Sequence, residues 1–486
     1  MTLGELFGPE AKLPDRLARV MISGLAADSR EVKPGYLFAA LPGVKTDGTH
    51  FIAQALERGA AAILVRAGAK PDVGSAALIE DNDPRRRLAL LAARFYAPQP
   101  KTVVAVTGTN GKTSVVSFVR QLWDGQGLQA ASLGTVGVVS PRGAEGLKHT
   151  TPDPIELHAI LSRLAREGVT HLALEASSHG LQQRRVDGIA FAAAAFTNLS
   201  RDHLDYHASV EDYFAQKLRL FTELLPRGAA AVVDVDSEAG KRVAAEAEAK
   251  GLVLISAGRE GNGLRLLSAE IDGFGQRLVI ERAGKTYNVR LPLVGAFQAS
   301  NALVAAGLAI ATGADAEAVI PLLERLKGAR GRLDLAGTAR GGAPIFVDYA
   351  HTPDALAKAL DALRPYVKHR LIVVFGCGGD RDQGKRPEMG RIAVEKADLA
   401  IVTDDNPRGE DPAAIRRDIL VAAPGAVEIG DRAHAIAEAI AALKQGDVLL
   451  VAGKGHETGQ TVGATVVPFS DHDAVEAALR QEACCG

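Results

Sequence analysis

Short apolar runs rich in Val, Ile and Ala alternate along most of the chain with longer stretches rich in Ala, Leu, Glu and Arg. The short runs predict strands and the longer stretches predict helices, and glycine or polar turns follow nearly every predicted strand. Because strands and helices alternate, we expect an α/β fold in which crossover helices connect parallel strands. The predicted strands include 61–65, 102–106, 172–174, 345–347, 371–375, 399–402 and 448–451.

Two interruptions of this pattern predict domain boundaries. A proline-rich break at 97–100 ends a predicted helix over 85–96, and a segment rich in Gly and Arg at 328–337 precedes the strand at 345–347. The expected domains are therefore 1–98, 99–330 and 331–486. A length of 486 residues also corresponds to about three domains.

Composition narrows the class of protein. The chain has 56 Lys and Arg against 58 Asp and Glu, a net charge of −2, which argues against general electrostatic binding of nucleic acid. Three cysteines, Cys377, Cys484 and Cys485, cannot build a disulfide framework and fit a reducing compartment. The N-terminus lacks a secretory signal pattern, and the longest uncharged stretch, 291–313, is interrupted by polar residues. We expect a soluble cytoplasmic protein without a membrane span.

A glycine-rich loop between the strand at 102–106 and a predicted helix has the pattern of a phosphate-binding loop. Glycines let backbone N–H groups approach phosphates, and the helix N-terminus adds positive potential. Lys112 can neutralise phosphate oxygens, and the Thr113 hydroxyl can bind Mg²⁺. The candidate ATP-binding residues are Gly108, Thr109, Asn110, Gly111, Lys112, Thr113 and Ser114.

Val106 stands where the full phosphate-loop pattern has glycine, so the motif is a shortened variant. The alternative is a glycine turn followed by a chance Lys-Thr pair, but the strand–loop–helix context favours the phosphate loop. The segment resembles the ATP loop of the Mur ligases and of the related folylpolyglutamate synthases, and the resemblance runs through most of the chain. It implies a small UDP-binding α/β domain, a central P-loop ATPase-type parallel sheet and a C-terminal Rossmann-like domain.

Candidate metal ligands lie in the middle of the chain. Glu175 follows the strand at 172–174, and His203 lies in a segment rich in His and Asp. Mg²⁺ uses few protein ligands, mostly oxygens, together with phosphates. Taken alone, each residue could equally be a capping or surface residue. The resemblance implies that Glu175 and His203 bind Mg²⁺ together with Thr113.

Lys217 lies on a predicted helix that begins with a capping box at Ser209. Apolar residues 214, 218 and 221 form one face of this helix, and Lys217 is off that face, which is typical of a solvated lysine. The resemblance instead implies that CO₂ carboxylates Lys217 and that the carbamate binds a second Mg²⁺. It names Lys112, Lys217, His203 and Arg332 as the catalytic residues.

Further nucleotide contacts are implied by the resemblance. Asn301 would contact adenine, although Gln298 stands where the family commonly has Asn. Arg332 would reach the ATP phosphates, Asp348 would bind the ribose hydroxyls, and His351 would lie near the same nucleotide edge. Without the resemblance, Asn301 could belong to a helix cap and Arg332 could be a surface residue in a flexible linker.

Three polar loops follow strands in the last domain, and ligands of open parallel sheets bind at the carboxyl ends of strands. Arg381 and Arg408 can bind carboxylates, Glu457 can bind an ammonium group, and Asn406 can bind either. This set fits an amino acid with several charged ends. A dinucleotide site is disfavoured because Arg381 replaces the third glycine of that motif. The loops are 376–382, 404–408 and 452–457.

The tetrapeptide 405–408 matches the signature of the family branch that adds meso-diaminopimelate, whereas lysine-adding relatives typically carry a neutral residue in place of Arg408. Diaminopimelate is lysine with an extra carboxylate, for which Arg408 would supply the counter-charge. The implied diaminopimelate-binding residues are Arg381, Asp405, Asn406, Pro407, Arg408, Gly453 and Glu457.

The resemblance also implies a site for a UDP-muramoyl peptide. The family often has Asn in place of His149, so this position departs from the pattern. The implied residues are Ala27, Ser29, Val44, Lys45, Thr46, His149, Thr150, Thr151, Ser177, Gln183 and Arg185.

Together with these features, the resemblance implies an Mg²⁺- and ATP-dependent amide ligase that joins meso-diaminopimelate to UDP-N-acetylmuramoyl-L-Ala-D-Glu through an acyl phosphate. We expect a cytoplasmic monomer with small-molecule substrates only. The nearest alternative is a lysine-adding ligase of the same family, and a folylpolyglutamate synthase is a more distant one. A different class, a non-catalytic nucleotide-binding switch, is disfavoured because Lys112, Glu175, His203, Lys217 and Arg332 are all present.

Overall fold

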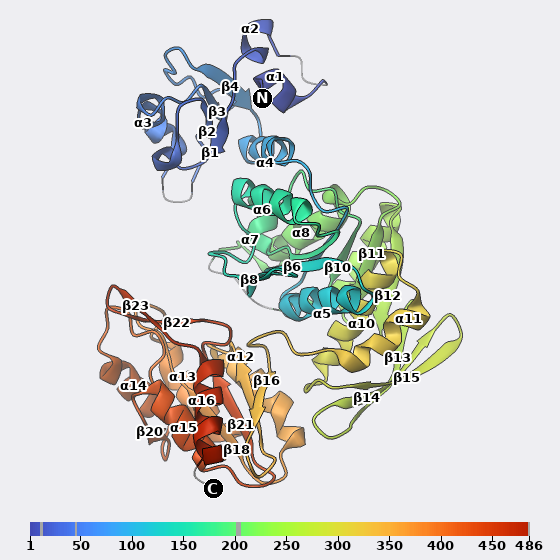
Figure 1. Cartoon of the computed structure of the whole chain (residues 1–486), viewed down its shortest axis with the longest axis vertical. Coiled ribbons are helices and arrows are strands. Elements are labelled where there is room, and N and C mark those ends of the chain that lie inside the picture. The colour runs from blue at the N-terminus through green and yellow to red at the C-terminus, as the bar shows by residue number, and fades with distance from the viewer. Residues whose placement is uncertain (10–12, 44–45, 201–205, 485–486) are drawn as a thin grey trace. The chain divides into compact units, whose positions relative to one another are not determined.

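The computed structural model describes residues 1–9, 13–43, 46–200 and 206–484, of which Ala483 and Cys484 are described by their backbone alone. Val44, Lys45 and His203 therefore lie outside the described residues. The chain divides into two compact units, and Figure 1 labels helices and strands of both. The first comprises Met1–Arg265 with Leu303–Val319, and the second comprises Leu266–Ala302 with Ile320–Gly486.

The first unit begins with a four-stranded parallel sheet whose order follows the sequence. Its two faces bury separate cores, since the neighbours Leu37 and Phe38 belong to different apolar clusters. The last helix starts at Pro84, and the Asp83 side chain caps it by accepting from the Arg86 N–H. The elements are β1 (Gly24–Ala26), β2 (Tyr36–Ala39), β3 (Ala62–Arg66), β4 (Ala77–Asp81), α1 (Leu3–Phe7), α2 (Asp15–Ala18), α3 (Ile52–Glu57) and α4 (Pro84–Phe95).

The same unit contains a larger sheet in the order β12-β11-β10-β5-β9-β6-β7-β8, parallel except at β7 and β8. Its strands are β5 (Thr102–Thr107), β6 (Ala130–Gly134), β7 (Gly137–Ser140), β8 (Gly143–Glu145), β9 (His171–Glu175), β10 (Ala193–Phe196), β11 (Ala230–Asp234) and β12 (Val253–Gly258). Its helices include α5 (Lys112–Gly125), α6 (Pro154–Arg166), α7 (Ser178–Gln182), α8 (Val210–Arg219) and α9 (Glu238–Ala249).

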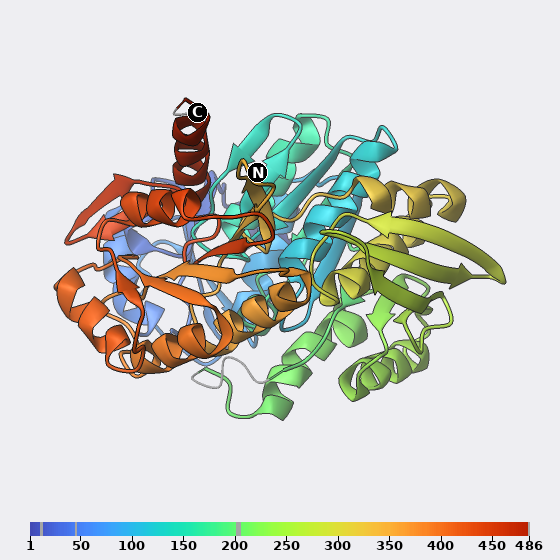
Figure 2. The same cartoon turned by 90° about the horizontal axis from the view of Figure 1, so that it is seen from below.

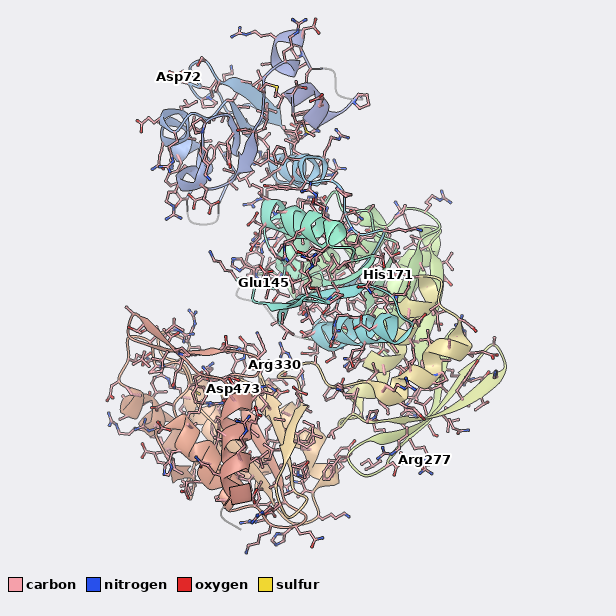
Figure 3. All side chains as sticks on the ribbon, in the orientation of Figure 1. Asp72, Glu145, His171, Arg277, Arg330 and Asp473 are labelled. Carbon is pink, nitrogen blue, oxygen red and sulfur yellow. The ribbon has the colours of Figure 1, made fainter. Side chains whose placement is uncertain are left out.

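Strand register brings three loops of this sheet to one edge. Val106 on β5 pairs with Glu175 on β9, and Thr107 pairs with Phe196 on β10. The three parallel strands therefore end side by side, and the loops that follow β5, β9 and β10 lie next to one another. His171 marks the other end of β9 (Figure 3).

The second unit carries a hairpin of β14 (Gln276–Arg282) and β15 (Lys285–Leu291), followed by a six-stranded sheet. That sheet is parallel except at its first strand, and its order is β16-β17-β21-β18-β19-β20. The strands are β16 (Asp334–Thr338), β17 (Pro344–Asp348), β18 (Leu371–Phe375), β19 (Leu399–Val402), β20 (Val427–Glu428) and β21 (Val448–Ala452). A small hairpin, β22 (Gly459–Val462) with β23 (Thr465–Pro468), follows.

Helices cover both faces of this six-stranded sheet (Figure 2). Ile372 and Val373 are neighbours on β18 and belong to the two different cores, as expected for a strand buried on both faces. One face packs on α12 (Pro353–Leu363), α13 (Lys385–Lys396) and α14 (Pro412–Leu420), and the other on α15 (Arg432–Ala441) and α16 (Asp471–Cys484).

The predicted α/β fold with parallel sheets is confirmed, and the predicted strands match observed ones to within one residue at each end. Asn301 lies inside α10 (Phe297–Ala311) and not in a cap before that helix. None of the helices in the described ranges is both long and apolar enough to cross a membrane.

Candidate active site

The phosphate loop requires glycine at two positions. Gly108 has φ +145°, and a Cβ added there would lie 2.0 Å from the Thr197 Oγ1. Gly111 has φ +85° and forms the N-cap of α5. Both conformations are readily open to glycine alone, so the sequence Gly-Thr-Asn-Gly encodes the tight turn from β5 into the helix.

The segment after β10 holds the phosphate loop in place. The Thr109 N–H donates to the Asn198 carbonyl over 2.8 Å, and the Asn110 N–H donates to the Asn198 Oδ1 over 3.0 Å. The Thr197 hydroxyl donates to the Asn110 carbonyl over 2.6 Å. Thr197 and Asn198 thus position the phosphate loop, and neither is among the site residues predicted from the sequence. The signal in the sequence was the apolar run 193–196, which directly precedes them.

The N-terminus of α5 and Lys112 form a cationic cradle. Lys112 folds over the loop, and its Nζ donates to the carbonyls of Gly108 at 3.0 Å and Thr109 at 2.7 Å. Thr113 and Ser114 are buried in the first helical turn. Backbone N–H groups, a helix dipole and an ammonium group converge here, which is the arrangement that binds phosphate groups.

Lys217 is buried against the same loop, so the interpretation of it as a solvated lysine is wrong. Its side chain is 1% exposed, and its Nζ donates to the Gly108 carbonyl over 2.7 Å. The Nζ lies 4.1 Å from the centre of the Tyr213 ring, and the Tyr213 hydroxyl donates to the Thr109 Oγ1 over 3.3 Å. Tyr213 and Lys217, one turn apart on α8, therefore form a second buried face that contacts the phosphate loop.

Glu175 lies at the end of β9 and is 1% exposed. Its Oε1 accepts from the Thr135 N–H over 2.8 Å, and its Oε2 accepts from the Thr135 hydroxyl over 3.2 Å. Each oxygen keeps a lone pair for a cation. The hydroxyl of Thr113 and the carboxylate of Glu175 are oxygen donors, the type that suits Mg²⁺. In the ranges that the structure describes, which omit His203, no three metal-binding side chains cluster.

Thr150, Thr151 and Ser177, predicted to bind the acceptor, are adjacent to Glu175. The Thr151 hydroxyl donates to the Glu175 carbonyl over 2.9 Å and lies 3.0 Å from the Ser177 Oγ. The Thr150 and Thr135 hydroxyls are 3.1 Å apart. These hydroxyl groups form a continuous polar strip beside the Glu175 carboxylate.

Arg185 and Gln183 extend this strip. The Arg185 Nη1 donates to the Thr151 carbonyl over 2.6 Å, and its Nη2 donates to the Gln183 Oε1 over 2.8 Å. Burial lowers the pKa of Arg185 from its usual value. The Gln183 Nε2 donates to the Tyr206 hydroxyl over 3.0 Å. His149 is exposed.

The residues predicted to contact UDP lie in turns of the first sheet. Ser29 is buried, and its hydroxyl donates to the Gln54 Oε1 over 2.6 Å. Ala27 and Thr46 are exposed. Val44 and Lys45 lie outside the described residues.

Asp348 and Arg332 lie together at the end of β17. The Asp348 carboxylate accepts from the Leu333 N–H over 2.7 Å and from the Ala350 N–H over 2.8 Å. Burial raises the pKa of Asp348, while Arg332 and these N–H groups oppose that rise. The Arg332 guanidinium lies 4.9 Å from the centre of the Tyr349 ring, so Arg332 is not a linker residue fully exposed to solvent.

His351 and Asn301 are also held by neighbours in the second unit. The His351 Nδ1 lies 2.8 Å from the Tyr349 carbonyl, and burial lowers the pKa of His351. The Asn301 Nδ2 donates to the Gln298 Oε1 over 3.0 Å, and both side chains are buried. Gln298, the position that departs from the family pattern, therefore orients Asn301.

The loops after β18 and β19 are joined by Arg408. The Gly379 N–H donates to the Asn406 carbonyl over 2.9 Å, and the Arg408 Nη1 donates back to the Gly379 carbonyl over 2.9 Å. Arg408 has φ +51°, an uncommon conformation for a residue with a side chain. Pro407 is buried beside it, whereas Arg381 is exposed in the loop after β18.

The loop after β21 is hydrogen-bonded to the loop after β19. The Asn406 Nδ2 donates to the Glu457 Oε2 over 2.9 Å, and the Lys454 Nζ donates to both side chains. Gly453 has φ +119°, and a Cβ there would lie 2.8 Å from the Asp405 Oδ2. Burial raises the pKa of Asp405. The structure thus brings together Asp405, Asn406, Gly453 and Glu457 and adds Lys454.

Three domain models match consecutive parts of the chain. "Mur ligase family, catalytic domain" matches residues 21–96, "Mur ligase middle domain" matches 106–309, and "Mur ligase, glutamate ligase domain" matches 331–455. The chain belongs to the Mur ligase family.

Curated relatives that are 49–57% identical to this chain share one name. A protein of Bradyrhizobium diazoefficiens is 57% identical over 99% of both chains, and one of Chelativorans sp. is 55% identical over 99% of both. Each is a UDP-N-acetylmuramoyl-L-alanyl-D-glutamate–2,6-diaminopimelate ligase. A solved structure of a ligase of that name is 32% identical, covers 99% of both chains and has a TM-score of 0.73.

Proposed function

We propose that this protein is the ATP-dependent ligase that adds meso-diaminopimelate to UDP-N-acetylmuramoyl-L-alanyl-D-glutamate during peptidoglycan precursor synthesis in the cytoplasm. Relatives that are 50–57% identical carry that name. The observation that carries the choice of amino acid is the cluster of Arg408, Asn406 and Glu457 at the ends of parallel strands.

We assign one substrate to each proposed domain. Residues 1–98 would bind the UDP end of the acceptor, 99–330 would bind ATP, and 331–486 would bind the amino acid. The strip of Thr150, Thr151 and Ser177 supports this assignment, because it would place the acceptor peptide next to the phosphate loop.

The reaction needs no side-chain nucleophile. The acceptor carboxylate attacks the γ-phosphorus of ATP, the bond to ADP breaks, and an acyl phosphate forms. The amine of diaminopimelate then attacks the acyl carbon, loses a proton, and phosphate leaves with its bonding electrons. Lys112 and Arg332 would stabilise charge on the transferred phosphoryl group, since such transfer depends mostly on positioning and electrostatics.

Thr113, Glu175 and His203 would hold Mg²⁺, and a carbamate on Lys217 would provide further oxygen ligands. A bound Mg²⁺ neutralises charge on the phosphate oxygens. The burial of Lys217 beside the Gly108 carbonyl supports its place in this group. The Lys112 ammonium group and the backbone N–H groups at the N-terminus of α5 would orient the phosphates.

Arg408 favours diaminopimelate over lysine as the amino acid. Its Nη1 is engaged by the Gly379 carbonyl, and within the described residues its Nε and Nη2 make no hydrogen bond. These two N–H groups can bind the extra carboxylate of diaminopimelate, which lysine lacks.

Mass analysis of the product tests the proposal. The purified protein would be incubated with ATP, Mg²⁺, the UDP-muramoyl dipeptide and either meso-diaminopimelate or L-lysine. We expect a product heavier than the dipeptide by diaminopimelate minus water, together with ADP and phosphate. Preferential addition of lysine would refute the choice of amino acid, and no phosphate release with either would refute the ligase. A Lys112→Met variant serves as the inactive control.

A further inference from the structure

Lys454 is a buried cation to which the proposed chemistry gives no role. It follows β21 directly after Gly453, and its side chain is fully buried. A lysine is almost never fully buried unless it is paired, because its ammonium group loses strong hydration. The groups that pair with Lys454 therefore indicate why it is there.

Lys454 closes a triangle of polar side chains. Its Nζ lies 3.1 Å from the Asn406 Oδ1 and 3.2 Å from the Glu457 Oε2, and the Asn406 Nδ2 donates to the same Glu457 oxygen over 2.9 Å. The Nζ also lies 3.7 Å from the Asp405 Oδ1. One ammonium group thus ties the loop after β19 to the loop after β21.

This triangle fixes the orientation of the Asn406 amide. The Oδ1 accepts from both the Lys454 Nζ and the Thr461 N–H, the latter over 2.9 Å, so the NH₂ group must point to Glu457. Without Lys454, flipping the Asn406 amide would break only its hydrogen bonds with the Thr461 N–H and Glu457. Its orientation would therefore be less strongly fixed. An amide with a fixed donor and acceptor can distinguish the charged ends of an amino acid.

The same contacts determine which oxygen of Glu457 can bind an incoming ammonium group. Both contacts engage the Oε2, and the Oε1 makes no hydrogen bond within the part of the chain that the structure describes. The Lys454 ammonium group lies 3.7 Å from the Asp405 Oδ1 and 3.2 Å from the Glu457 Oε2, so its positive charge attracts both carboxylates and holds them in place. One carboxylate oxygen is thereby left for an incoming ammonium group.

We propose that Lys454 is a positioning residue of the amino-acid site, which orients Asn406 and Glu457 to bind an ammonium-bearing end of the incoming amino acid without touching it. The inference rests on the proposed function. It adds a residue that determines how well the amino acid, rather than ATP or the UDP-linked acceptor, is bound.

A Lys454→Met variant removes the charge while keeping a side chain of similar length. We expect the KM for meso-diaminopimelate to rise about tenfold or more, because charged hydrogen bonds are lost. The KM values for ATP and the UDP-muramoyl dipeptide should stay within about twofold of wild type. A Lys454→Arg variant, which restores a cation, should recover part of the loss.

The control is Lys396→Met, which removes a partly exposed lysine paired with Asp361 on the surface of the same unit. If Lys454→Met fails to fold, as judged by its melting curve, Lys454→Gln provides a smaller, uncharged replacement that can still donate a hydrogen bond. An unchanged KM for diaminopimelate, or an equal rise in all three KM values, would overturn the inference. Failure of the proposed function would appear in the wild type, as no diaminopimelate product.

Discussion

The Lys217 Nζ donates a 2.7 Å hydrogen bond to the Gly108 carbonyl, across 109 residues of sequence. The same carbonyl accepts from the Lys112 Nζ over 3.0 Å. A helix far along the chain is therefore attached to the loop that would bind phosphate. Any change in the charge of Lys217 acts directly on that loop, because the interaction is buried and weakly screened.

The first prediction concerns Lys217 as a carbamate. A Lys217→Arg variant keeps a cation near Gly108 but cannot be carboxylated by CO₂. We expect it to lose ligase turnover by at least about a hundredfold, as expected for loss of a group that stabilises transferred charge. In the wild type, ¹³C-bicarbonate should produce a lysine carbamate signal in the NMR spectrum that the variant lacks.

Lys241→Arg, on an exposed surface ion pair, is the matched control and should retain turnover. A Lys217→Arg protein with normal turnover, or a Lys217→Ala protein that is intact and fully active, would show that turnover does not require a carbamate on Lys217.

The second prediction concerns Gly108. In Gly108→Ala, the new Cβ would lie 2.0 Å from the Thr197 Oγ1, at φ +145°. The loop must shift, so we expect turnover to fall by at least about a hundredfold and the free energy of unfolding to drop by about 2 kcal/mol. Gly127→Ala is the control, because Gly127 has φ +77° but open space around it. It should cost about 1 kcal/mol of stability and leave turnover unchanged.

The third prediction concerns Arg408 and the choice of amino acid. Arg408→Met removes the guanidinium while keeping an apolar stem. We expect the KM for meso-diaminopimelate to rise about thirtyfold, which corresponds to one lost charged hydrogen-bond pair. The KM for lysine should change little, so the ratio of kcat/KM values shifts toward lysine. Arg417→Met, at an exposed arginine on α14, is the control. Equal effects on both amino acids would contradict the role of Arg408.

The fourth prediction concerns His158 and pH. Burial lowers the pKa of His158 from 6.5 to about 4, and its Nε2 lies 3.3 Å from the Asp187 carbonyl. The unfolded chain therefore binds a proton below about pH 6.5 while the folded protein does not until about pH 4. His158 should thus cost the folded state up to about 3 kcal/mol as the pH falls through this window.

Denaturant unfolding between pH 7 and pH 4 would measure this effect. His158→Gln should have a flatter pH dependence than wild type, even if it is less stable at pH 7. The exposed His434→Gln variant is the comparison and should follow the wild-type curve. Parallel curves for wild type and His158→Gln would refute the prediction.

Sequence patterns predicted the strands and the phosphate loop because these depend on local signals. A buried parallel strand requires a continuous apolar run, and the turn from β5 to α5 requires glycine at Gly108 and Gly111. The polar loops after β18, β19 and β21 could also be placed together, since parallel strands end at one edge of a sheet.

Periodicity alone could not place Lys217. A single apolar face on its helix predicts that the remaining residues face solvent, whereas Tyr213 and Lys217 contact the phosphate loop on a second side. The roles of Thr197 and Lys454 depend on contacts between segments distant in sequence. The local pattern around each residue is that of an ordinary turn, so the sequence indicates where the turn lies but not which groups the side chain contacts.

The order of the segments within the two units has a consequence for how the protein is made. The first unit consists of Met1–Arg265 together with Leu303–Val319. The later segment supplies buried residues of α10, and Gly307 packs so closely on Val232 of β11 that an added Cβ would lie 2.6 Å from its Cγ1. A chain released at Arg265 would leave that face of β11 uncovered. On the ribosome, the first unit can finish folding only after the intervening segment Leu266–Ala302 has been synthesised.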